Sequence, residues 1–118
     1  MSQRLDRLAD LVRAELAVLL QREVRDPRVG LATVTRVELS RDLGHAVIHI
    51  SALGSEEQRT GAIAALMHAR GFLRRELAHR LSLRTTPELK FVLDRGAEHS
   101  QRISDLLDDL KGEGSHGS

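Results

Sequence analysis

The stretch IAALMHARGFLRREL, residues 63–77, decides the fold of this chain. Its apolar residues recur at helical spacing, in the order Ile63, Leu66, Met67, Leu73 and Leu77. On one unbroken helix Arg70 would lie in the middle of this stripe, where a buried unpaired charge is costly. Gly71, a poor helix former, follows at once. We therefore expect two helices that meet at Ala69-Arg70-Gly71, and we expect Gly71→Leu to destabilise the protein by crowding the junction.

Upstream of this stretch the sequence predicts one helix and two strands. The helix follows an apolar stripe that comprises Leu5, Leu8, Val12, Leu16, Leu19 and Leu20. It must end near Arg25, because Asp26-Pro27 disfavours helical geometry. Residues 32–40 are rich in β-branched side chains, and a second strand follows in which Ala46, Ile48, Ile50 and Ala52 alternate with Val47, His49, Ser51 and Leu53. Turn chemistry in residues 40–44 joins these two strands into an antiparallel hairpin.

Downstream, Ser55 has the chemistry of a helix N-cap, and a helical run of about residues 56–83 follows it. Leu89, Phe91 and Leu93 alternate with other residues as a third strand. A final short helix is marked by Ile103, Leu106, Leu107 and Leu110. The prediction is one α+β domain over residues 1–111, in the order α-β-β-α-α-β with an extra C-terminal helix, and a flexible polar tail over residues 112–118. We expect the helices to cover one face of a three-stranded sheet.

Several classes of function are disfavoured by what the sequence lacks. Without cysteine there is no disulfide framework, thiolate metal site or cysteine nucleophile. No phosphate-binding loop or Gly-x-Ser-x-Gly motif occurs, and His45 and His49 would lie about 13 Å apart on a strand, too far to chelate one ion. We therefore expect no catalysis, no metal and no cofactor. No apolar run approaches the roughly 20 residues that span a bilayer and no signal core follows Met1, so we expect a cytoplasmic protein without membrane contact.

The net charge of +1 conceals an uneven distribution of charge along the chain. From residue 68 to 95 seven basic residues outnumber three acidic ones, whereas from residue 96 onward five acidic residues outnumber two basic ones. The basic residues suit phosphate binding, and the alternative is that they only solvate a surface helix. Candidate RNA-binding residues are Arg4, Arg7, Arg28, Arg41, Arg70, Arg74, Arg75, Arg80, Arg84 and Lys90.

We expect five of these residues to form one phosphate-facing surface: Arg4, Arg7, Arg70, Arg74 and Arg75. Reversing the charge of Arg74 and Arg75 should then abolish binding and leave the melting curve nearly unchanged. The only aromatic residues, Phe72 and Phe91, fit core positions, so stacking of bases on exposed rings is not expected. Recognition should rest on phosphates and on the shape of the RNA.

Four short motifs, in order along the chain, resemble the ribosome-binding factor A family. They are REVRDPRVG (residues 22–30), VELSRDL (37–43), ARGFLR (69–74) and LRTTPELKF (83–91), which is followed by Asp94. The resemblance runs from about residue 4 to residue 110. It implies a KH-like fold of the bacterial type (type II), in which an Ala-x-Gly helix kink replaces the usual Gly-x-x-Gly RNA clamp. Ala69-Arg70-Gly71 matches that replacement.

The same resemblance implies the function of a non-catalytic assembly factor. Such a factor binds the immature small ribosomal subunit and its rRNA, helps process the rRNA end and aids growth in the cold. An assembly GTPase helps to release it, and we expect the protein itself to be a monomer. The short acidic C-terminus departs from the family, so functions of longer tails are not carried over. Two alternatives stay open, a KH-like module for another structured RNA and a basic domain that binds an acidic protein.

Overall fold

The computed structural model describes residues 3–94. Its elements are, in order, α1 (Gln3–Arg22), the 3-10 helix η1 (Pro27–Val29), β1 (Ala32–Leu39), β2 (His45–Ala52), α2 (Glu56–His68), α3 (Arg70–Leu81) and β3 (Glu88–Leu93). The predicted order α-β-β-α-α-β is confirmed, and η1 is added where Asp26-Pro27 ends the first helix. The helix predicted at residues 103–110 and the tail of residues 112–118 lie outside the described residues.

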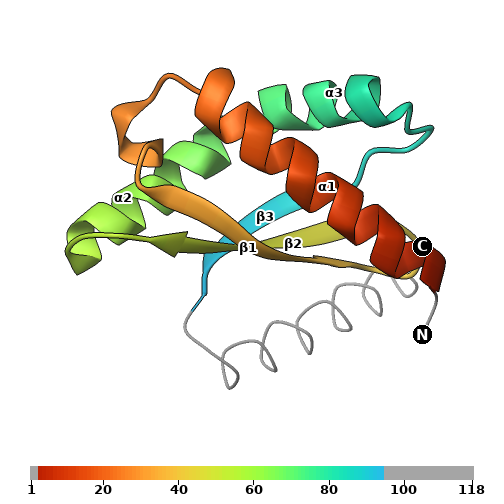
Figure 1. The fold of residues 1–118 in the computed structure, drawn as a ribbon, viewed down its shortest axis with the longest axis horizontal. Helices are drawn as coiled ribbons and strands as arrows, with labels where there is room; N and C mark the ends of the chain where they lie inside the picture. The colour runs from red at the N-terminus through yellow and green to blue at the C-terminus, as the bar shows by residue number, and fades with distance from the viewer. Residues whose placement is uncertain (1–2, 95–118) are drawn as a thin grey trace, which may run out of the picture.

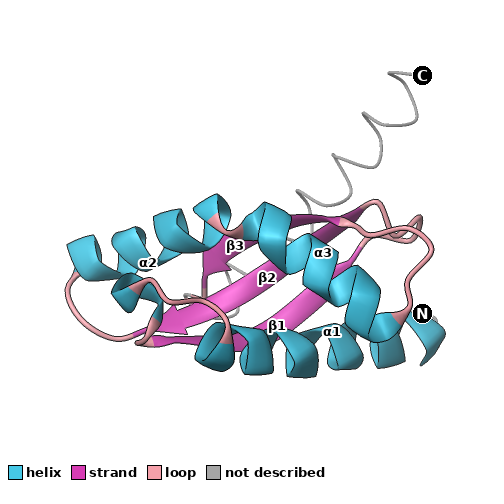
Figure 2. Cartoon of the chain, turned by 90° about the horizontal axis from the view of Figure 1, so that it is seen from above, coloured by secondary structure: helices cyan, strands magenta, loops and turns pink. Residues whose placement is uncertain are grey.

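Within the described residues three strands form one mixed sheet in the order β1-β2-β3. The predicted hairpin is confirmed, since β1 and β2 pair antiparallel, whereas β3 pairs parallel to β2. A parallel pair needs a connection that crosses over the sheet, and α2 and α3 provide it. Figure 1 and Figure 2 show the three α-helices together on one face of the sheet, as expected from the sequence.

The hydrophobic core lies between this face of the sheet and the helices. Its large, fully buried apolar side chains come from all three α-helices and from β2, and include Leu16, Leu19, Ile48, Ile50, Leu66, Leu73 and Leu77. The predicted alternation of β3 is confirmed, because Leu89, Phe91 and Leu93 are buried. Each such side chain contributes about 1.5–3 kcal/mol by leaving water. These contacts fix the positions of the helices over the sheet.

The strand β1 departs from simple alternation at Thr35. Val34 pairs with Ile50 and Arg36 pairs with His49, so Thr35 is an extra residue and forms a β-bulge. The bulge lets Val34 and Val37, three residues apart, both be buried in the core. The sequence did not predict this bulge.

The second face of the sheet is also partly buried. Val47 and His49 alternate with the core residues of β2 and so lie on the face away from the helices, yet both are buried. Val92 of β3 packs against Val47 there. Side chains of β2 are therefore buried on both faces of the sheet.

The helix α2 begins with a capping box, which confirms the predicted N-cap. The Ser55 hydroxyl accepts a hydrogen bond from the backbone N–H of Gln58 at 3.2 Å. In return, the backbone N–H of Ser55 donates to the side-chain oxygen of Gln58 at 2.8 Å. Two backbone donors at the helix start are thereby satisfied.

Ser55→Ala should lower the free energy of unfolding by about 1 kcal/mol, because one backbone donor of α2 loses its acceptor. Urea denaturation followed by circular dichroism measures the change. Ser55→Asp supplies another capping oxygen and should keep nearly the full stability. An equal loss in both variants would contradict the assigned role of the cap.

Candidate nucleic-acid interface

The helices α2 and α3 meet at a break of one residue, Ala69, with φ −86° and ψ 0°. The N–H of Ala69 still donates to the carbonyl oxygens of Ala65 at 3.0 Å and Leu66 at 3.1 Å. The Ala69 carbonyl in turn accepts from the N–H of Leu73 at 3.0 Å. Figure 2 shows the change of direction between the two helices. The break predicted at the Ala69-Arg70-Gly71 motif is confirmed.

The break takes Arg70 out of the apolar stripe. Leu66 and Leu73 are fully buried on either side of it in the sequence, while Arg70 is exposed. Gly71 is exposed too, and a Cβ atom built on it would lie 3.7 Å from the nearest neighbouring atom, Nη1 of Arg75. The expectation that a longer side chain at Gly71 would crowd the junction is therefore wrong. The unusual backbone conformation belongs to Ala69.

A hollow of about 560 Å³ opens beside the junction. It is lined by Ala64, Met67, His68, Arg70, Gly71, Arg74 and Glu88. The end of α2 contributes apolar surface, α3 contributes two guanidinium groups, and β3 contributes one carboxylate. This combination suits a ligand with an anionic part and a less polar part.

Arg74 uses its guanidinium group inside the protein. Its Nε donates to the carbonyl oxygen of Pro87 at 3.0 Å, and its Nη2 donates to that of Thr86 at 2.8 Å. Its Nη1 lies 3.3 Å from the Glu88 carboxylate. These contacts tie α3 to the loop that leads into β3. The expectation of a solvent-facing Arg74 whose replacement leaves stability unchanged must therefore be corrected, since Arg74 has a structural role.

Arg80 is held by three carboxylates. Its guanidinium nitrogens lie 3.5 Å from Glu76, 3.6 Å from Glu15 and 3.8 Å from Glu23. Because Glu76 belongs to α3 and Glu15 to α1, this cluster joins the two helices. From the sequence alone, Arg80 could either bind phosphate or pair with Glu76. In the structure it pairs with Glu76.

Arg28 is paired with Asp26 at the start of η1. The guanidinium contacts both carboxylate oxygens, with Nη2 at 2.8 Å from Oδ2 and Nε at 3.1 Å from Oδ1. The backbone N–H of Arg28 also donates to Asp26 Oδ1 at 3.0 Å. The side-chain hydrogen bond, followed by the backbone one, lowers the pKa of Asp26 to about 2. Arg28 therefore belongs to the local turn.

The other arginine candidates lie in two separate groups. Arg70 and Arg75 lie in the first half of α3, on the C-terminal side of the α2–α3 junction, are exposed and form no ion pair with the described residues. We call these two the junction arginines. The second group, the end arginines, is exposed on the first turns of α1, on the β1–β2 turn and on the loop after α3, and comprises Arg4, Arg7, Arg41 and Arg84.

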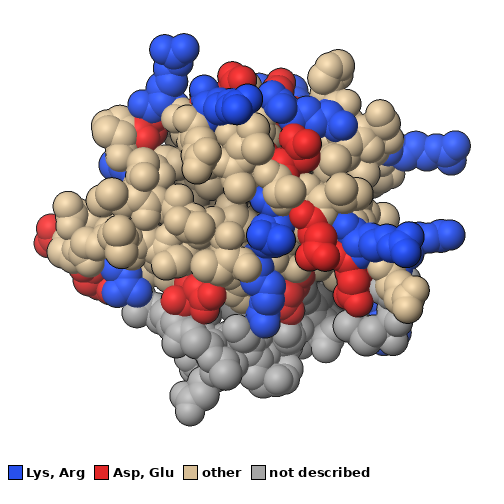
Figure 3. All heavy atoms as spheres, in the orientation of Figure 1, with Lys and Arg blue, Asp and Glu red and all other residues tan. Residues whose placement is uncertain are grey.

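Figure 1 and Figure 2 place the three segments that carry the end arginines at one end of the sheet. The backbone N–H of Glu88 donates to the carbonyl of Gly44 at 2.9 Å, which joins the β1–β2 turn to the loop that precedes β3. Arg70 lies at the first residue of α3 and Arg75 in its middle, whereas the last turn of α3 leads into this end. Figure 3 shows Lys and Arg side chains along the upper edge and at the right-hand end of one face, with Asp and Glu between them. The single surface expected from sequence is thus two groups.

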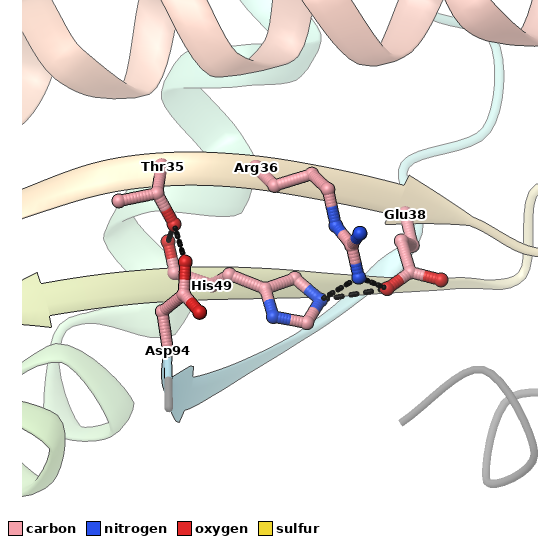
Figure 4. A network of polar contacts seen from close by, with 5 residues as sticks. All are labelled: Thr35, Arg36, Glu38, His49 and Asp94. Atoms are coloured by element: carbon pink, nitrogen blue, oxygen red, sulfur yellow. Dashed lines mark hydrogen bonds and ion pairs between the residues drawn. The ribbon is translucent and has the colours of Figure 1, made fainter. Parts of the chain in front are cut away.

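Lys90 lies on the other face of the sheet. It pairs in register with Val47, whose side chain points away from the helices, and it is exposed. Figure 4 shows a network of polar contacts in this region that the sequence did not predict. His49 Nε2 lies 2.7 Å from the Glu38 carboxylate, which also pairs with Arg36, and the Thr35 hydroxyl donates to Asp94 at 2.7 Å.

The sequence analysis missed Glu88 as a member of the site. Glu88 adds to the local charge balance and lies in the fourth motif, but nothing in the sequence places residue 88 beside residue 74. The parallel pairing of β3 with β2 and the carbonyl contacts of Arg74 bring the two together. In residues 3–94 no group of three or more His, Cys, Asp or Glu residues could hold a metal ion. None of the helices described is long and apolar enough to cross a membrane.

Comparison with known proteins adds a family to this geometry. Residues 4–107 match the family model described as ribosome-binding factor A. A protein named ribosome-binding factor A from Thermomicrobium roseum is 47% identical over 112 residues, which are 95% of this chain and 87% of the relative.

Solved structures agree with this match. The crystal structure of ribosome-binding factor A from Thermus thermophilus has a TM-score of 0.70 and 34% identity, covering 78% of this chain and 98% of that one. A homology model of the Thermus thermophilus protein, fitted into a cryo-EM map of its complex with the 30S subunit, has a TM-score of 0.55 and 36% identity, covering 71% of this chain and 92% of that one. These likenesses confirm the fold class expected from the sequence, a KH-like α+β fold.

Arg74→Ala should lower the free energy of unfolding by about 1.5 kcal/mol, because two loop carbonyls lose a charged donor. Arg75→Ala, the same change at the next residue, should stay within about 0.5 kcal/mol of the wild type, since Arg75 is exposed and unpaired among the described residues. Urea denaturation of both variants measures the difference. Equal free energies of unfolding for the two variants would show that the hydrogen bonds of Arg74 to the loop carbonyls do not stabilise the protein.

The pKa of Asp26, followed by NMR titration of its carboxyl carbon, should be about 2 in the wild type. In Arg28→Gln it should rise toward 3.8, the ordinary value, because the guanidinium no longer favours the ionised form. A lowered pKa means that this pair stabilises the protein above about pH 3.8 and that the contribution is lost as the pH falls through about 2. Arg25→Gln, a neighbouring exposed arginine, is the control and should leave the Asp26 titration in place.

Proposed function

The chain belongs to the ribosome-binding factor A family, and we propose from this that it binds the maturing small ribosomal subunit without catalysing a reaction. The family match over residues 4–107 is the observation that carries the proposal. The 30S complex of the Thermus thermophilus relative supports it, since that chain is 36% identical to this one.

The junction arginines are the proposed centre of the RNA contact. Arg70 and Arg75 are exposed and have no ion-pair partner among residues 3–94, so their guanidinium groups can bind phosphate oxygens without breaking an existing pair. The end arginines form a second contact along the RNA backbone. Arg74, Arg80 and Arg28 keep their structural partners, and Lys90 faces away from both groups.

Phosphate contacts dominate this recognition because the chain has no Tyr or Trp and its two Phe rings pack against the core. Phe91 is buried and Phe72 is half-buried against the core. These two are the only aromatic residues in the sequence. Stacking of bases on aromatic side chains, which many single-strand binders use, is therefore no part of the proposal.

The finer function follows the family resemblance. We propose that binding promotes maturation of the rRNA, including processing of its end, and that this aids growth in the cold. We also propose that an assembly GTPase releases the protein from the subunit. The protein acts as a monomer, and it is located in the cytoplasm with the ribosome. A KH-like module for another RNA would bind RNA without preferring the small subunit. A basic protein-binding domain would bind neither RNA nor subunit.

Arg75→Glu should weaken binding to small ribosomal subunits at least tenfold in a co-sedimentation assay, since it repels the phosphate that the guanidinium would hold. Lys90→Glu makes the same change of charge on the other face of the sheet and should keep binding nearly intact. Both residues are exposed, so both variants should melt like the wild type. Wild-type affinity should fall with salt, with a slope of about −0.7 to −0.9 in log K against log salt for each phosphate contacted.

A slope near zero would favour the protein-binding alternative. Equal losses in the two variants would show that net charge, and not the junction, determines binding. Strong binding to unrelated structured RNA with no preference for the small subunit would favour the KH-like module for another RNA.

A further inference from the structure

We propose that the hollow at the α2–α3 junction takes one unpaired guanine base of the bound RNA, whose edge is read by the Glu88 carboxylate. This inference rests on the proposed function, because it names what one part of the RNA contact recognises. One acidic side chain lies among the arginines that line this hollow. The hollow that Arg70 and Arg74 line also contains Glu88.

The carboxylate of Glu88 would lower the affinity of a site that binds only phosphate, because it repels the anion. It is not needed to hold Arg74, whose Nε and Nη2 already donate to two carbonyl oxygens at 3.0 and 2.8 Å. The contact from Arg74 Nη1 to Glu88 Oε1 is longer, at 3.3 Å, and the Glu88 side chain is 60% exposed. An exposed pair of this kind adds little to stability. The acid is therefore placed for a ligand with hydrogen-bond donors.

Guanine is the base whose edge fits a carboxylate. Its Watson–Crick edge carries a ring N–H and an amino group side by side, so both can donate to the two oxygens of one carboxylate. Adenine and cytosine place an acceptor nitrogen beside their amino group, and uracil places a carbonyl oxygen on each side of its N–H. Each of these three bases therefore places an acceptor atom next to an oxygen of the carboxylate, which is unfavourable because neither atom can donate a hydrogen bond.

The rest of the hollow suits a base and its phosphate. Ala64 and Met67 supply apolar surface for a ring, and the planar guanidinium of Arg70 can stack on that ring or hold the adjacent phosphate. A base can thus be held here without a Phe, Tyr or Trp side chain, and the exposed His68 ring also lines the hollow. Arg74 holds the backbone in front of the acid in place, since it donates to the carbonyl oxygens of the two residues before Glu88.

The test uses the full chain and short uridine oligoribonucleotides that carry one central guanosine, inosine or adenosine. Fluorescence anisotropy should show that the wild type binds the guanosine probe about tenfold more tightly than the adenosine probe. Inosine keeps the ring N–H and lacks the amino group, so its affinity should lie between the two. Glu88→Gln should bring the three affinities within about twofold, because an amide offers one acceptor and sets a donor against the guanine.

Glu57→Gln is the matched control, since Glu57 is an exposed acid in the first turn of the same helix whose last turn lines the hollow. This variant should keep the full preference for guanosine. Thermal melting checks that both variants are folded. Equal affinity of the wild type for the three probes, binding of none of them, or a preference that survives in Glu88→Gln overturns the inference. Co-sedimentation with small subunits in the same preparation tests the proposed function separately, and it can succeed while the guanosine preference is absent.

Discussion

The charge of Arg70 constrains the path of the whole second half of the chain. On a continuous helix, Arg70 would follow Leu66 by four residues and precede Leu73 by three, so it would enter the core with them. One residue, Ala69, leaves helical geometry and removes this conflict while its N–H and carbonyl stay bonded. The change of direction lets α2 contact β2 and β3 while α3 reaches across to α1. The crossover that parallel pairing of β2 and β3 requires is therefore made of two short helices.

Once the helices are placed, local geometry decides which arginines can bind a phosphate. Arg74 lies over the loop before β3, and its bonds to two carbonyl oxygens stabilise the protein more than an exposed ion pair would. Arg80 lies between α1 and α3 and is surrounded by carboxylates. Arg75, next to Arg74 in sequence, points elsewhere on the helix and stays unpaired among the described residues. The basic segment of the sequence is thus divided into residues that hold the fold and residues that face solvent.

The sequence was sufficient wherever a rule of spacing or local chemistry applied. Alternation located β3, capping chemistry located the start of α2, and the phase conflict at Arg70 located the helix break. It was insufficient where two distant residues meet. The bulge at Thr35 depends on the register with β2, and the acceptors of Arg74 lie 12 and 13 residues away in the chain. The error at Gly71 has a similar cause, because only the packing shows that this glycine faces solvent.

The proposed guanine site would let a protein with two Phe residues and no Tyr or Trp discriminate among RNA sequences. Phosphate contacts by exposed arginines give affinity that is nearly independent of sequence. Selectivity requires a group that strengthens binding of one base and weakens binding of the others. A carboxylate among arginines has that property, because it repels phosphate and accepts hydrogen bonds from a base with two adjacent donors. Arg74 joins α3 to the loop before β3, and the same side chain lies beside this carboxylate near the helix break. The expulsion of Arg70 from the core thereby places two guanidinium groups and the proposed base-reading carboxylate around one hollow.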